Sequence, residues 1–402
     1  MANSATFPSP APTPAFGHTR VQSRALDDAT TVPWYIWCAV AAVTSAMVGA
    51  HWDISWHRSI GRDAFLTPAH IAIYLCGILA GLSCGYLILA TTFGRLPELR
   101  PASVKMWGFR GPLGAFISAW GGVAMITSAP FDNWWHNAYG LDVKVLSPSH
   151  VVLIAGVFAV EMGTLMLILA FMNRSSGALR KTLEWLFLYL GAMILVLMLI
   201  LTFEYCFRSL YHSALFYRVM SMALPAVIAG VGYASGRRWA STASAAIYMG
   251  FMLALCWILP LFPAQPKLGP VYHEVHQFIP PPLPLLLIVP AIALDLLRRR
   301  TASWARWQQA VAGGVAFLGT LWAVQWPFGT FLMSPGARNW IFGSGFFDYL
   351  TRPDSPYAHN LFFSVEKTAE QFWTSMAWAL VFAILTTWLG LAWGSWMRRV
   401  QR

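Results

Sequence analysis

Charged side chains are scarce in this chain of 402 residues. Asp, Glu, Lys and Arg make up 11% of the sequence, while hydrophobic residues make up 57%. This composition is typical of a membrane protein, and apolar runs long enough to cross a bilayer recur along the chain. We predict an all-α polytopic membrane protein with about ten transmembrane helices, at approximately 33–52, 68–93, 112–130, 148–172, 183–204, 213–235, 239–262, 281–297, 307–330 and 371–396.

Closely spaced cysteines are also lacking. The five cysteines are scattered, with no Cys-x2-Cys pair, and only Cys206 falls outside the predicted spans, at an outer helix end. Neither a disulfide framework nor a thiolate metal site is therefore predicted. Residues 1–30 lack the basic start and short apolar core of a cleavable signal peptide. They are rich in Ala, Pro, Ser and Thr, which indicates a disordered cytoplasmic tail.

The distribution of positive charge argues against a nucleic-acid partner, although the net charge is +11. Eighteen of the 27 Lys and Arg residues fall in the tails and loops on one predicted side of the membrane. This bias is typical of cytoplasmic loops. We therefore expect a bacterial inner-membrane protein with both termini in the cytoplasm and the lipid bilayer around it. Additional membrane subunits or a homo-oligomer are further possible partners.

A polar motif occurs twice at one end of the predicted helices, with a spacing of 79 to 80 residues. The first copy is Asp53, Trp56, His57, Gly61, Asp63, Thr67, Pro68 and His70. The second copy is Asp132, Trp135, His136, Gly140, Asp142, Ser147, Pro148 and His150. Two imidazoles and a carboxylate at each place are typical of a transition-metal site. The repeat predicts either two such sites or one site built from both copies.

The duplicated motif divides the chain into regions. Each copy joins a helix running outward to a helix running inward, so the duplication is direct, with two helical hairpins in 33–172. Residues 183–402 contain further transmembrane helices without a comparable repeat. A long periplasmic loop is expected at 331–370. Its length and polarity favour a cap over the site.

The spacing within each copy places polar groups on one helix face. Asp53 and His57 are four residues apart, as are Asp132 and His136, so carboxylate and imidazole stack on the same side of a helix. Both side chains could bind one metal ion. Alternatively, the carboxylate could accept a hydrogen bond from the imidazole and orient it toward the metal, without binding the metal itself. The spacing does not separate these two interpretations.

The second half of each copy resembles the start of a helix. In the first copy, Thr67 fits the N-cap, Pro68 the first helical position and His70 the third. The positive end of the helix dipole disfavours a charged imidazole there, and so favours the neutral form that metals bind. Gly61 and Gly140 are expected to allow the turns between paired helices.

Glu161 lies eleven residues after His150, about three helical turns deeper into the predicted membrane. An ionisable residue at that depth is costly and is a functional candidate. We interpret Glu161 as a candidate catalytic residue that relays protons. A protonated carboxyl that hydrogen-bonds between helices is the structural alternative.

The duplicated motif resembles that of a known family. The pattern Asp-x3-His-x12-His is similar to the copper-ligand motif of the membrane C subunit of particulate methane and ammonia monooxygenases. That subunit has a second site of the form Asn-x3-His-x13-His, and the second copy here matches it with Asp in place of Asn. The similarity covers residues 51–150. It implies two copper sites, with ligands Asp53, His57, His70, Asp132, His136 and His150.

The resemblance also implies oxygen activation near the periplasmic face and an apolar substrate that enters from the bilayer. The chain is longer than the family subunit and has no soluble copper domain. Copper is the metal that the resemblance implies, with zinc as the second choice. Two other functions stay open: a metal transporter or metal-handling protein, and a helical scaffold in which the motif clamps helix pairs without metal.

Overall fold

The protein is described here by a computed structural model that covers residues 31–61, 63–140, 147–267, 275–343 and 362–401. The expected cytoplasmic tail, 1–30, lies outside these residues. The described chain is almost entirely helical, and its only strands are the short antiparallel pair β1 (Val104–Met106) and β2 (Phe109–Gly111). The expected all-α fold class is confirmed.

Nine helical segments are long and apolar enough to span a membrane within the described residues. One of them is broken at Pro225, where α7 gives way to α8, because proline has no backbone N–H to continue the helix. The segments are α2 (Trp34–Ser59), α3 (Pro68–Thr92), α4 (Leu113–Tyr139), α5 (Pro148–Met172), α6 (Gly177–Leu201), α7 (Ala214–Ala223) with α8 (Pro225–Ala234), α9 (Ala240–Ile258) with η4 (Leu259–Leu261), α11 (Arg306–Met333) and α12 (Ala369–Met397).

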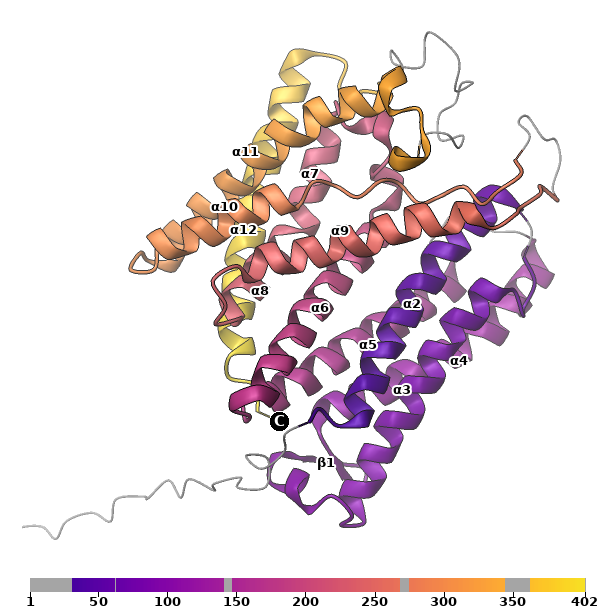
Figure 1. The fold of residues 1–402 in the computed structure, drawn as a ribbon, viewed down its shortest axis with the longest axis vertical. Helices are drawn as coiled ribbons and strands as arrows, with labels where there is room; N and C mark the ends of the chain where they lie inside the picture. The colour runs from indigo at the N-terminus through magenta and orange to yellow at the C-terminus, as the bar shows by residue number, and fades with distance from the viewer. Residues whose placement is uncertain (1–30, 62, 141–146, 268–274, 344–361, 402) are drawn as a thin grey trace, which may run out of the picture.

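The helix expected at 281–297 is wrong in its first half. The chain from 275 to 286 is not helical, and α10 (Ile288–Arg300) begins only afterwards. Four prolines lie between 280 and 284, and each lacks the N–H that a helix needs. Figure 1 shows this extended segment running beside α9 and continuing into α10. The expected tenth span is therefore half extended and half helical, and it is not among the nine candidate spans of the described residues.

Buried side chains satisfy the backbone of this extended half. Tyr248 Oη accepts the N–H of Leu285 at 3.0 Å, and Gln325 Oε1 accepts the N–H of Leu286 at 3.1 Å. Both Tyr248 and Gln325 have no exposed surface. Backbone that is not helical is tolerated at membrane depth only where protein supplies such partners.

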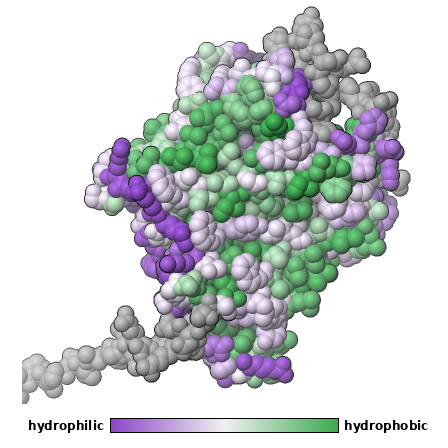
Figure 2. Space-filling view, in the orientation of Figure 1, coloured by the Kyte–Doolittle hydropathy of each residue, from purple (hydrophilic) through white to green (hydrophobic). Residues whose placement is uncertain are grey.

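The outside of the molecule is mostly apolar. In Figure 2 hydrophobic side chains spread over the middle of the visible face, and a hydrophilic cluster lies at the left, over the turn after α10. That helix ends in Arg298, Arg299 and Arg300. Exposed large hydrophobic residues occur on most of the long helices, for example Leu82, Trp120, Trp185 and Leu385. A lipid bilayer is the environment that such a surface fits.

The two hairpins of the repeat, α2–α3 and α4–α5, form one four-helix group beside α6 and α9 (Figure 1). The start of α2, the end of α5 and the end of α12 lie together. Asn173 donates to the carbonyl of Met397 at 2.9 Å, and the rings of Tyr35 and Phe171 are 6.1 Å apart. The repeated motif therefore lies at the opposite end of these helices, on a single side.

Short 3-10 turns complete the connections: η1 (Pro97–Ala102), η2 (Phe203–Tyr205), η3 (Arg208–Leu210), η5 (Pro335–Ala337) and η6 (Trp340–Phe342). The last two belong to the loop expected at 331–370. Its residues 344–361 lie outside the described part of the chain, so its expected role as a cap stays a prediction. α11 extends to Met333, which leaves the connection slightly shorter than expected.

A carboxylate from the end of this loop caps α7. Glu366 accepts hydrogen bonds from the Ser213 hydroxyl at 2.7 Å and from the backbone N–H groups of Ala214 and Leu215 at 3.2 and 2.9 Å. Partial burial alone would raise the pKa of the Glu366 carboxyl. The hydrogen bonds, which include one from Ser364, outweigh burial and lower this pKa below its ordinary value.

We expect Glu366→Gln to lower the stability of the protein by about 1 kcal/mol at neutral pH, the usual contribution of a helix cap. Because the folded pKa lies below the unfolded value of about 4.3, the carboxylate stabilises the fold above that pH and loses this effect as pH falls through the folded pKa. Thermal unfolding in detergent across pH measures it. The exposed Glu370→Gln is the control. A pH-independent loss in Glu366→Gln would contradict the assignment.

Candidate metal centres

The first copy of the motif lies where α2 ends and α3 begins. α2 continues to Ser59, seven residues beyond the apolar span expected from the sequence, so Asp53 and His57 lie on its last turns. Gly61 has φ of 85°, a left-handed conformation that an ordinary side chain disfavours, and it turns the chain toward α3. Asp63 follows this turn, and His70 lies in the first turn of α3.

These four side chains meet. His70 Nε2 is 3.2 Å from Asp53 Oδ1 and 3.2 Å from Asp63 Oδ2. His57 Nε2 is 3.7 Å from Asp53 Oδ2 and 3.6 Å from Asp63 Oδ2. One atom that could bind a metal ion, from each of Asp53, His57 and Asp63, lies within 4.8 Å of the other two. This three-residue set contains Asp63 in place of the predicted ligand His70, whose Nε2 lies beside both carboxylates.

The second copy repeats this arrangement at the end of α4 and the start of α5. His136 Nε2 and His150 Nε2 are each 3.5 Å from a different oxygen of Asp132. Donor atoms of Asp132, His136 and His150 lie within 4.8 Å of one another. Gly140, with φ of 87°, makes the turn. Asp142, the counterpart of Asp63, lies outside the described residues.

The two helix starts differ in their caps. At α5, Ser147 is the N-cap and its hydroxyl accepts the N–H of His150 at 3.3 Å, as expected. At α3, Thr67 holds the N-cap position, but its hydroxyl exchanges hydrogen bonds with Ala64 instead. The expectation that a side chain caps both helices is therefore right for α5 and wrong for α3. Thr67 fixes the loop that carries Asp63.

Neighbouring groups orient the second cluster. The Nδ1 atom of His136 is 3.0 Å from the carbonyl of Gly140, and the hydroxyl of Ser149 donates to Asp132 Oδ1 at 2.6 Å. When Nδ1–H donates to a backbone carbonyl, Nε2 is left with its lone pair toward Asp132. This is how metal-binding histidines are commonly oriented.

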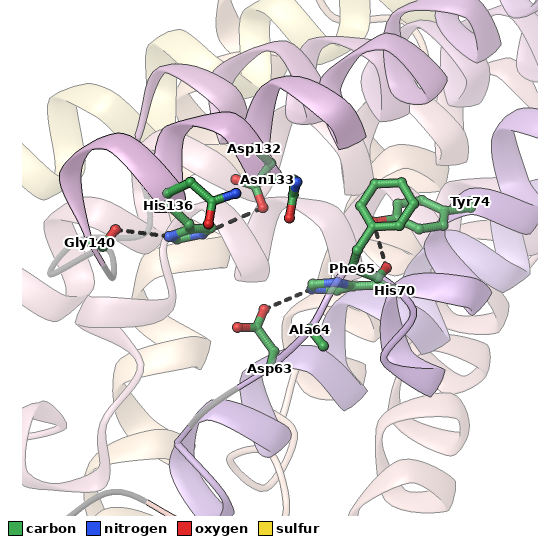
Figure 3. A pocket seen from close by; sticks show the side chains of 10 residues that line it. Asp63, Ala64, Phe65, His70, Tyr74, Asp132, Asn133, His136 and Gly140 are labelled. Carbon is green, nitrogen blue, oxygen red and sulfur yellow. Dashed lines mark hydrogen bonds and ion pairs between the residues drawn. The ribbon is translucent and has the colours of Figure 1, made fainter.

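The two clusters open into one cavity of about 330 Å³. Figure 3 shows Asp132 and His136 on one side of it, facing Asp63 and His70 on the other. Residues of α3, α4 and both turns line this space. The sequence left open whether the copies form two sites or one, and the geometry is intermediate: two separate ligand sets that share a single chamber.

The first cluster brings two carboxylates and two imidazoles together. The hydrogen bond from His70 lowers the pKa of the Asp63 carboxyl to about 2, so this group is ionised at neutral pH. The Asp63 and Asp53 side chains are 10% and 18% exposed. Two partly buried carboxylates beside two imidazoles form a site that a divalent cation would neutralise.

Asp63 was not among the metal ligands predicted from the sequence. The signal for it was present, because Asp63 and Asp142 recur in both copies, but a capping role in the loop was equally consistent. Ser149 was also missed. Its contact with Asp132 depends on how α4 packs against α5, which neither residue reveals alone.

Glu161 is fully buried on α5. Neither of its carboxyl oxygens has a hydrogen-bond partner among the described residues, and the same holds for Thr164 Oγ1 one turn further. The alternative of a carboxyl hydrogen-bonded between helices is therefore not what the described residues show.

Three comparisons with known proteins returned no match: no family model, no curated protein and no solved structure is similar to this chain. The site must therefore be interpreted from its own chemistry.

Proposed function

We propose that this chain is a copper-binding protein of the bacterial inner membrane, related to the C subunit of particulate methane and ammonia monooxygenases, and that it activates oxygen near the periplasmic face. The observation that supports the proposal most is the convergence of Asp132, His136 and His150 on one point, mirrored by the first cluster. Imidazole and carboxylate donors suit Cu(II), and a bound copper supplies one-electron chemistry toward oxygen.

The residues fit a copper ion in two further respects. The second set has one carboxylate and two imidazoles, and the contact of His136 Nδ1 with the Gly140 carbonyl favours the tautomer in which Nε2 can bind a metal. The shared chamber leaves room beside both sets for a small molecule. Zinc would accept the same donors, so the metal has to be identified directly.

Electron paramagnetic resonance of purified protein loaded with Cu(II) tests this proposal. We expect a Cu(II) signal that shows nitrogen hyperfine splitting from two imidazoles for each copper ion. A signal without nitrogen coupling, or protein that prefers zinc when both metals are supplied in equal amounts, would contradict a copper function.

Metal transport is the second candidate, and the half-extended form of the expected tenth span favours it. Discontinuous transmembrane segments often form the ion sites of transporters. Copper uptake into proteoliposomes, compared with oxygen consumption by the same preparation, separates the two functions. Uptake that stays at the rate of empty vesicles would exclude transport.

The proposed topology gives a second test. Cysteines introduced at Ala64 and Tyr139, which are exposed in the two motif turns, should react with an impermeant thiol reagent in intact spheroplasts. Cysteine at Lys105, which is exposed in the loop between α3 and α4, should react only after lysis. The reason is the excess of Lys and Arg on the Lys105 side. Labelling only at Lys105 in intact cells would reverse the topology.

Glu161 is proposed to relay protons toward the metal region. It is about 16 Å from His150 at ~1.5 Å per helical residue, too far to bind the same metal. We expect Glu161→Gln to keep copper content and thermal stability, and to slow reoxidation of the reduced copper protein by oxygen, which consumes protons. Unchanged reoxidation would leave Glu161 without a relay role. Loss of copper would contradict the placement of Glu161 too far from His150 to bind the same metal.

A further inference from the structure

A second, much smaller cavity lies against the extended half of the expected tenth span. Its volume is about 20 Å³, enough for one water-sized occupant. It is enclosed by α2, α6, α9, the segment around Cys206 and the chain at 282–285. The residues with possible donor atoms on its wall are His51, Cys206, Tyr211, Tyr248 and Met252.

His51 has the orientation of a ligand. Its side chain is 4% exposed, and its Nδ1 atom is 3.0 Å from the carbonyl of Met47 on the same helix. If Nδ1–H donates to that carbonyl, Nε2 carries the lone pair and lies on the side of the ring away from α2. Among the described residues, the contact with Met47 is the one hydrogen bond of the His51 ring. The arrangement matches that of His136 in the second cluster.

Two sulfur atoms complete a possible ligand set on the same wall. Cys206 is 5% exposed, and its thiol contacts one neighbouring residue, donating to the carbonyl of Thr202 at 3.4 Å and lying 3.9 Å from the Thr202 hydroxyl. Met252 of α9 is 4% exposed. Thiolate, thioether and imidazole are together the donors that Cu(I) prefers. This grouping could not be predicted from the sequence, because His51, Cys206 and Met252 come from three distant segments.

The charge of the cavity selects the oxidation state. Among the described residues, those that line the cavity include no Asp, Glu, Lys or Arg. A divalent ion with one thiolate would leave a net positive charge buried without a partner, which is costly. A monovalent ion with one thiolate is neutral. The cavity therefore fits Cu(I) better than Cu(II) or zinc.

We propose that His51 Nε2, Cys206 Sγ and Met252 Sδ form a buried Cu(I) site, distinct from the two clusters at the helix ends. On binding, the S–H bond of Cys206 breaks, a sulfur–copper bond forms and the proton leaves to solvent; the copper arrives as Cu(I), so no electron is transferred. The choice of copper rests on the proposed function, but the site itself does not depend on the outer ligands.

The test uses protein that lacks the outer sites, with His57, His70, His136 and His150 all replaced by alanine. Anaerobic titration with Cu(I) against a chromophoric chelator should give one tightly bound Cu(I) per chain. X-ray absorption of that ion should show copper–sulfur scattering. Adding Cys206→Ser or His51→Leu should weaken Cu(I) binding by more than the ~10–100-fold typical of a change beside the ligands. Cys256→Ser, a buried thiol one turn from Met252, should have no effect.

The outcomes separate this proposal from the proposed function. If the outer-site variant binds no Cu(I), or binds it without sulfur scattering, the buried site does not exist, and a single water in the cavity is the remaining explanation. That result leaves the outer clusters untouched. Should Cys206→Ser fail to fold, the absorption spectrum of the outer-site variant still decides. If the outer-site variant instead keeps its Cu(II), the proposed function fails while the Cu(I) site can stand.

Discussion

Replacing His57, His70, His136 and His150 together with alanine should reduce the Cu(II) bound per chain from about two ions to nearly none. Each of these rings directs Nε2 toward a carboxylate in its own cluster, at 3.2 to 3.7 Å. Loss of a direct ligand is expected to exceed the ~10–100-fold change that follows loss of a supporting group. Spin counting of Cu(II) by electron paramagnetic resonance in detergent-purified protein gives the stoichiometry, because Cu(I) contributes no signal.

Variants of one cluster at a time show whether the sites are independent. His57→Ala with His70→Ala should remove one copper, and His136→Ala with His150→Ala the other. Because the clusters share a cavity, a bound ion at one also affects the other through charge, and the second copper should bind more weakly when its neighbour is filled. His276→Ala, which changes an exposed histidine outside both clusters, is the control. Quadruple-variant protein that binds as much Cu(II) as the wild type would refute the central claim.

The local parts of the site could be predicted from the sequence. The four-residue spacing of Asp53 and His57 needs only helical geometry, and the turn at Gly61 needs only a residue that tolerates positive φ. The cap at Ser147 is equally local. Each of these depends on neighbours within a few positions, so one sequence carries enough information.

The parts that failed depend on contacts between distant segments. The prolines between 280 and 284 are a local signal against a helix, but nothing near 281–287 shows that Tyr248 and Gln325 satisfy an extended backbone there. The shared chamber likewise follows from the packing of α3 against α4, and not from either motif copy. Hydropathy measures the cost of burying a segment and not the shape that the segment takes.

Glycines make the contact that brings the two halves of the second cluster together. Gly121 of α4 lies against Gly156 of α5, and a Cβ added at Gly121 would be 2.7 Å from the carbonyl oxygen of Gly156 and from the backbone N of Val160. Gly114 and Gly163 pair in the same way two turns away. Small residues of this kind let membrane helices approach backbone to backbone.

We therefore expect Gly121→Ala to destabilise the protein by about 1–3 kcal/mol or more, the range for overpacking a close contact. The added methyl group meets backbone atoms, which cannot rotate away, so α4 and α5 must separate. Their separation also moves Asp132 away from His150, and Cu(II) should be lost from the second cluster before the first. Thermal unfolding and copper analysis of the same preparation measure both effects.

Gly81→Ala is the matched control, because Gly81 lies within α3 and a Cβ there would meet no atom within 4 Å. That change should be neutral or slightly stabilising, since alanine favours a helix over glycine by about 1 kcal/mol. Equal unfolding temperatures for the Gly121→Ala and Gly81→Ala proteins would mean that the α4–α5 contact is not as close as described. Destabilisation of Gly121→Ala with full copper at both clusters would instead show that Asp132 and His150 hold their metal without help from the helix contact, and the positioning role of the glycine pair would then be wrong.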